Sequence, residues 1–108
     1  MLKGIDNRLN AEVLGTLRGM GHGDCIIVVD TNFPAESVAR ATLTGKLLRM
    51  ENLTAAEAMN AILSVLPLDT FVDDFAGRME VVDKPEEVPP VQVEVHAEID
   101  RAEGRFRP

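Results

Sequence analysis

Tryptophan and tyrosine are absent from this chain of 108 residues, and cysteine occurs once, as Cys25. A single cysteine cannot form a disulfide within the chain, so we expect a reducing, cytoplasmic compartment. No apolar stretch exceeds a few residues, which is too short to span a bilayer, so we expect no membrane association. Asp6 and Arg8 interrupt the N-terminus before a signal peptide could form.

Basic residues are also scarce. Eleven Lys and Arg stand against eighteen Asp and Glu, which gives a net charge of −7. Residues 66–100 hold ten of the acids and only two of the bases. Such a surface repels phosphate backbones, and no compact basic stripe offsets the repulsion, so we expect no nucleic-acid partner.

Hydrophobic residues make up 45% of the chain, an ordinary share for a globular protein. The length suits one domain over residues 1–108 with a single core. No internal repeat is visible. The Pro-rich acidic stretch at 84–90 is typical of a solvated surface loop.

Three segments have helical patterns. Asn10 is a plausible N-cap for a helix that Gly21 ends, and Thr54 with Glu57 forms a capping-box sequence before an apolar stripe that Pro67 ends. Residues 91–102 fit both an alternating strand and one helical face. Pro90 and the acids near the start favour a helix there.

Three other segments have strand character. The apolar run Cys25–Val29 suits a central strand covered on both faces, which would make Cys25 an inert core thiol. Residues 47–50 and 79–82 read as shorter strands. Because these alternate with helices, the predicted class is α/β with a central sheet flanked by helices.

The string Gly21-His22-Gly23-Asp24 is the first candidate for chemistry. Glycines on both sides allow a tight turn, and an imidazole with an ordinary pKa of about 6.5 can donate or accept a proton near neutral pH. The other interpretation is a turn histidine that makes one structural hydrogen bond.

Three sets of acids are further candidates. Asp30 follows the apolar run, where it could bind a sugar hydroxyl or begin an Asx turn. Asp69 and the pair Asp73–Asp74 could serve as acid–base carboxylates or be solvated charges. His22, Cys25 and His96 lack metal-ligand spacing, so we predict no metal site.

Several strings together carry a family resemblance: Met1–Ile5, Leu14 with Leu17, Met20–Asp24, Ile26–Asp30 and Asn32–Ala35. They resemble the L-fucose mutarotase branch of the FucU/RbsD family, densely over residues 1–38 and more thinly to about residue 103. The resemblance implies a layered α/β fold and ring-like homo-oligomers, often decamers. It also implies cofactor-free interconversion of the anomers of a free monosaccharide such as L-fucose. His22 would be the proton donor and Asp30 a substrate contact.

The chain departs from the family at its end. Family members run longer and close with tyrosine-containing segments that contact the sugar, whereas this sequence has no tyrosine. The last part of the family fold is therefore expected to be missing. Without the tyrosine, Asp69 is the candidate for the base that would act together with His22. Two other interpretations stay open, namely a non-catalytic monosaccharide-binding module and an inactive truncated fragment.

The spacing of His22 and Asp30 suggests where the pocket lies. Eight residues separate them, and an extended path of that length covers roughly 20–26 Å, more than one monosaccharide can bridge. Unless the chain folds back, the two residues would meet one sugar only from different subunits, in a pocket between copies of the chain.

Overall fold

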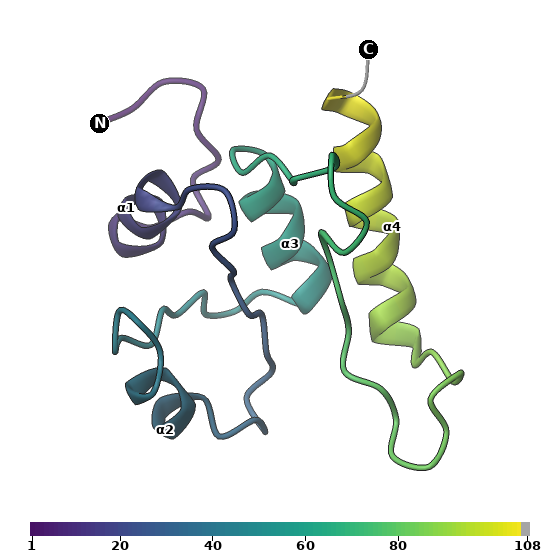
Figure 1. The fold of residues 1–108 in the computed structure, drawn as a ribbon. Helices are drawn as coiled ribbons and strands as arrows, with labels where there is room; N and C mark the ends of the chain where they lie inside the picture. The colour runs from purple at the N-terminus through teal and green to yellow at the C-terminus, as the bar shows by residue number, and fades with distance from the viewer. Residues whose placement is uncertain (107–108) are drawn as a thin grey trace.

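Four helices joined by long connections form the computed structural model, which describes residues 1–106 and, of residues 104–106, the backbone alone (Figure 1). They are α1 (Ala11–Gly19), α2 (Ala35–Arg40), α3 (Ala55–Leu63) and α4 (Pro90–Phe106). Figure 1 shows α3 between α1 and α4. The helix α3 packs along α4.

The sequence correctly predicts the starts of α1 and α3. The Asn10 side chain accepts a hydrogen bond from the Val13 N–H at 2.9 Å. Thr54 and Glu57 form the complete capping box, in which each side chain accepts from the other residue's backbone N–H. These contacts satisfy amide groups that would lack partners at a helix start.

The ambiguous segment 91–102 is helical, as predicted, within α4. Pro90 occupies the first helical position, where its missing N–H costs no helical hydrogen bond. The short helix α2 is not predicted by the sequence, which indicates only a turn at Asn32–Pro34.

The core lies between α1 and α3. Its buried members are Leu9, Val13, Leu17, Ala61 and Ile62. Half-buried side chains from the connections pack around them, including Ile26, Leu48 and Leu66. The apolar stripes of the two helices therefore face each other, and the connections that leave both helices are held against the same cluster.

A chain of polar contacts ties the N-terminal segment to α3 and α4. Arg8 donates two side-chain hydrogen bonds to Asp6, at 2.9 and 2.6 Å, and one to the Asn60 Oδ1 at 2.6 Å. Asn60 in turn donates to the nearly buried Glu98 at 2.9 Å, and Arg101 donates to the other oxygen of Glu98 at 2.8 Å. The hydrogen bonds from Arg8 lower the pKa of Asp6 from 3.8 to about 2.

The predicted strands are wrong for the part of the chain that the structure describes. Residues 25–29, 47–50 and 79–82 are irregular, and between residues 1 and 106 the one β-pairing is an isolated bridge between Val81 and Lys84. A strand needs a neighbour to satisfy its backbone groups, and among residues 1–106 no backbone hydrogen bond involves residues 25–29. The central sheet and the α/β class are therefore not seen.

The same difference reverses the predicted burial of residues 25–29. The side chain of Cys25 is exposed and not in the core, and Ile27 is 70% exposed. The predicted burial of this segment is therefore wrong for residues 1–106, because burial depends on partners from elsewhere in the fold and not on the apolar pattern alone.

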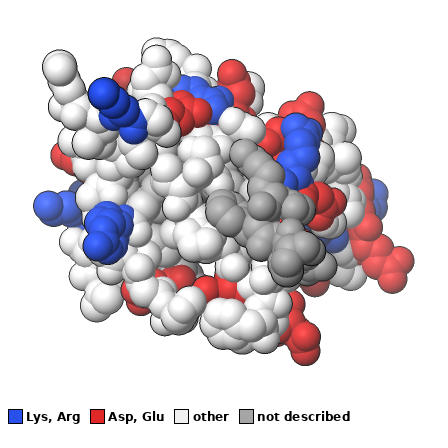
Figure 2. Space-filling view, turned by 90° about the horizontal axis from the view of Figure 1, so that it is seen from above, with Lys and Arg blue, Asp and Glu red and all other residues white. Residues whose placement is uncertain are grey.

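Charged side chains do not gather into one basic patch on the face in Figure 2, where acids and bases alternate around a broad uncharged area. No helix between residues 1 and 106 is long and apolar enough to cross a membrane.

Candidate functional site

The turn Gly21–Asp24 holds the side chain of His22 outward. The Asp24 carboxylate accepts from the Gly21 N–H at 2.8 Å, and the Asp24 N–H donates to the Gly21 carbonyl at 3.1 Å. Gly23 has a φ of +89°, which side chains with a Cβ rarely adopt. The closed turn leaves the His22 side chain 81% exposed.

Asp69 lies against this turn, although it is distant in sequence. Its Oδ1 is 2.8 Å from the His22 Nδ1, and its Oδ2 accepts from the Gly23 N–H at 3.3 Å. The Asp69 side chain is 29% exposed, so the carboxylate is largely covered while the imidazole faces solvent. Both carboxylate oxygens are thus anchored to one turn.

The core explains how the two residues meet. The turn at His22 follows α1 directly, and Asp69 follows α3 by way of Leu66, which packs against the core cluster. Within the second connection, the Thr70 N–H donates to the Leu68 carbonyl and the Val72 N–H donates to the Asp69 carbonyl. The packing of α1 against α3 therefore brings the two connections together.

The pair has a defined protonation pattern. The hydrogen bond from His22 is the largest influence on the pKa of Asp69, and it lowers that pKa. Partial burial raises the pKa by less, and the hydrogen bond from the Gly23 N–H lowers it by a still smaller amount, so the pKa of Asp69 lies below its usual value. An ionised carboxylate only accepts hydrogen bonds, so the proton on the His22 ring sits on Nδ1. The Nε2 atom is therefore the ring nitrogen that is available to bind a ligand.

An aromatic ring adjoins the pair. Phe71 lies edge to face with His22, with ring centroids 5.2 Å apart at 81°. Phe71 is 72% exposed. The sequence does not predict a role for this residue, because a lone phenylalanine in an acidic connection has no pattern that distinguishes it.

Asp30 is not part of this cluster. Its Oδ1 accepts from the Asn32 and Phe33 N–H groups at 3.0 and 3.1 Å, which is the Asx turn that the sequence analysis keeps as one interpretation. Among residues 1–106, no hydrogen bond or ion pair joins Asp30 to His22 or Asp69. Asp73 and Asp74 are exposed.

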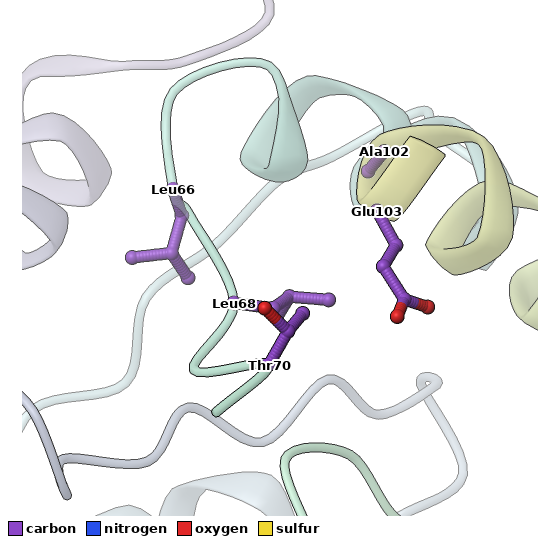
Figure 3. Close-up of a pocket in the computed structure, with 5 residues that line it drawn as sticks. All are labelled: Leu66, Leu68, Thr70, Ala102 and Glu103. Carbon is purple, nitrogen blue, oxygen red and sulfur yellow. The ribbon is translucent and has the colours of Figure 1, made fainter. Parts of the chain in front are cut away.

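The hollow beside Asp69 is too small for a sugar. It measures about 10 Å³ and lies between residues 66–70 and the end of α4 (Figure 3). Figure 3 shows Leu68 and Thr70 facing Glu103 across it. That volume holds one water molecule at most, so any sugar at His22 would bind on the open side of the imidazole.

A wider, open hollow of about 360 Å³ runs along α4. It is lined by His96 and Asp100, whose closest atoms are 3.7 Å apart and whose side chains are both more than two-thirds exposed. This pair lacks the short hydrogen bond and the backbone anchor of His22 and Asp69, so the His22–Asp69 pair is the better candidate. In the described residues, no group of three or more His, Cys, Asp or Glu side chains could hold a metal ion.

Several curated proteins that are similar to this chain are named fucose mutarotase or L-fucose mutarotase. The chain is 42% identical over 82 residues to the fucose mutarotase of Homo sapiens, a match covering 75% of this chain and 51% of that protein. It is 34% identical over 104 residues to the L-fucose mutarotase of Haemophilus influenzae strain PittEE, covering 96% and 69%. The chain thus spans about half the length of the mammalian relatives that it matches.

A solved structure supports the fold. The crystal structure of protein Atu2016, described as a candidate sugar binding protein, superposes with a TM-score of 0.93 at 59% identity. The match covers all of this chain and 72% of that one. The model of the RbsD / FucU transport protein family matches residues 3–107. The chain belongs to the RbsD/FucU family and has its fold.

Proposed function

We propose that this protein is a sugar mutarotase that interconverts the α and β anomers of free L-fucose. The observation that carries the proposal is the His22–Asp69 pair, in which a carboxylate fixes an imidazole whose Nε2 faces solvent. Relatives named fucose mutarotase at 34–42% identity support the same reaction.

The chemistry moves two protons, and it breaks and then re-forms one carbon–oxygen bond. Protonated His22 gives its Nε2 proton to the ring oxygen, while water takes the proton of the anomeric hydroxyl. The ring C–O bond breaks to leave the open-chain aldehyde. After rotation about the C1–C2 bond the aldehyde closes on its other face. In that step the ring oxygen returns its proton to His22, and water returns a proton to the carbonyl oxygen, which becomes the anomeric hydroxyl.

Asp69 acts through His22 in this scheme. Its carboxylate accepts the hydrogen bond from Nδ1 and so holds the imidazole with Nε2 directed at the sugar. Positioned acid–base groups contribute about 10²–10⁴-fold to such steps. The reaction exchanges no electrons and needs no nucleophile, so the proposal includes no cofactor or metal.

In the proposed site, Asp30 contacts the sugar from a second copy of the chain. We infer a homo-oligomer, as in the ring expected from the resemblance, in which Asp30 of one copy meets the sugar held at His22 of another. Exposed apolar side chains support association, among them Ile27 at 70%, Leu43 at 100% and Val82 at 84% exposure. Pairing of residues 25–29 with a segment of a second copy would also supply the neighbouring strand that the predicted central sheet needs.

The oligomer is tested by sedimentation velocity over a range of concentrations. A discrete assembly, with anomer exchange that is lost on dilution to the monomer, is the expected result. A monomer with full activity would overturn the pocket between copies.

Cytoplasmic location stays a prediction that depends on the single cysteine.

The activity is tested by NMR saturation transfer between the α and β anomeric protons of L-fucose. Exchange above the spontaneous rate is expected for the native chain. It should be lost in His22→Gln, whose amide cannot transfer a proton at neutral pH. The control Asp73→Asn changes an exposed acid of the same connection and should leave exchange intact.

A second candidate function is sugar binding without catalysis, which the description of the Atu2016 structure favours. It predicts that L-fucose binds, by titration calorimetry, and that binding survives His22→Gln while no exchange occurs. Unchanged exchange in His22→Gln would overturn the catalytic role of this histidine.

A further inference from the structure

Phe71 is an exposed apolar ring at the candidate site. Its side chain would be expected to turn inward, yet 72% of the residue is accessible while its ring contacts His22 edge to face at 5.2 Å. The connection that carries it is held by two backbone hydrogen bonds, from Thr70 to Leu68 and from Val72 to Asp69. The ring is thus placed beside the imidazole by the same turn that places Asp69.

The proposed reaction fixes where a sugar must lie relative to this ring. The sugar's ring oxygen must meet the Nε2 atom of His22, because Nδ1 is occupied by Asp69. The ring oxygen has two carbon neighbours. One is the anomeric carbon, whose hydroxyl must lose a proton and so needs water or a polar group. The other is C5, whose substituent lies only two bonds from the ring oxygen.

An aromatic ring packed against the imidazole suits the second neighbour. Apolar C–H groups bind to aromatic rings by dispersion and by removal of apolar surface from water, whereas the anomeric hydroxyl gains nothing from such a ring. A 6-deoxy sugar carries a methyl group on C5, a hexose carries a hydroxymethyl group there, and a pentopyranose carries only hydrogen.

We propose that Phe71 is a specificity-determining residue that contacts the C5 substituent, so that the site prefers 6-deoxyhexoses to the matching hexose and pentose. This inference rests on the proposed function and names the feature of the substrate that the site reads. One methyl group in an apolar contact is worth about 10-fold or more in specificity.

The test uses three sugars that differ only at C5: L-fucose, L-galactose and D-arabinose in their pyranose forms. Anomer exchange is measured for each with the native chain and with Phe71→Ala and Phe71→Leu. The substitution Met79→Ala removes a side chain of equal exposure from a position further along the same connection and serves as the matched control.

The native chain should prefer L-fucose to D-arabinose by about 10-fold or more in kcat/KM. Phe71→Ala should lose most of that preference through a higher KM for L-fucose, with D-arabinose changed less than about twofold. Phe71→Leu should retain part of the preference, and Met79→Ala should retain all of it. Equal losses on all three sugars, or no loss on any, would overturn the inference.

A second readout separates this inference from the proposed reaction. The chain has four phenylalanines, two histidines and no tyrosine or tryptophan, so few aromatic protons can be irradiated. Saturation transferred from these protons to bound L-fucose should reach the methyl group most strongly, and this enhancement should fall in Phe71→Ala. If the chain binds L-fucose with that methyl signal but catalyses no exchange, only the proposed reaction fails. If exchange occurs without the methyl signal, only the inference fails. Absence of both binding and exchange overturns both.

Discussion

Ile62 is the residue at which the packing of α1 against α3 can best be tested. Its side chain is 3% exposed, and it lies in the buried cluster with Leu9, Val13 and Leu17. Substitution by alanine removes three carbon atoms, worth about 0.8 kcal/mol each in lost transfer free energy. The cavity left behind adds to this cost, so Ile62→Ala should lower the free energy of unfolding by about 3 kcal/mol.

Two other variants bracket this prediction. Ile62→Val removes one carbon atom and should cost about 1 kcal/mol. Val91→Ala, in the exposed first turn of α4, should lie within about 0.5 kcal/mol of the native chain. Because Ile62→Val keeps most of the stability, it stays measurable even if the alanine variant unfolds.

The assay is urea denaturation followed by circular dichroism at the helical band. Intrinsic fluorescence is unsuitable because the chain has no tryptophan or tyrosine. The expected result is a lower urea midpoint with an unchanged slope. A cost below about 1 kcal/mol for Ile62→Ala, or equal costs for the alanine and valine variants, would refute the cluster as the centre of the fold.

Three further predictions concern a cap, an ion pair and the site. Thr54→Ala should lower the free energy of unfolding by about 1 kcal/mol in the same assay, and Thr54→Ser should restore most of it. The pKa of Asp6 falls from 3.8 to about 2 in the folded chain, so its stabilising effect is complete above pH 3.8 and is lost as pH falls towards 2. The urea midpoint of Asp6→Asn should therefore fall less than the native midpoint over this window, and parallel pH curves would contradict the Arg8 pairing. Asp69→Asn should slow fucose anomer exchange by about 10²-fold or more, because the amide no longer fixes the tautomer and orientation of the His22 ring. An unchanged rate would exclude that role.

The family resemblance and the starts of α1 and α3 follow from local residues. The caps at Asn10 and Thr54 depend on side chains that bond to amides three residues away, so the sequence contains all the partners that these contacts need. The helix at 91–102 likewise follows from Pro90 and an apolar face.

The strand predicted at residues 25–29, which the structure does not show, is the opposite case. Its composition predicts burial between layers, but the pairing partner is not in its own sequence, and residues 1–106 do not supply one. Cys25 is exposed for the same reason: an apolar run follows it, but no neighbouring strand within residues 1–106 covers it.

The candidate site combines both cases. The sequence identifies His22 by its flanking glycines, which are local, and can offer Asp69 only as one of several acids in an acidic block. Only the packing of α1 against α3 places Asp69 2.8 Å from His22, and Phe71 beside both. Local chemistry determines which groups can donate, accept or cap, whereas contacts between residues 47 positions apart depend on how the two helices bury their apolar faces.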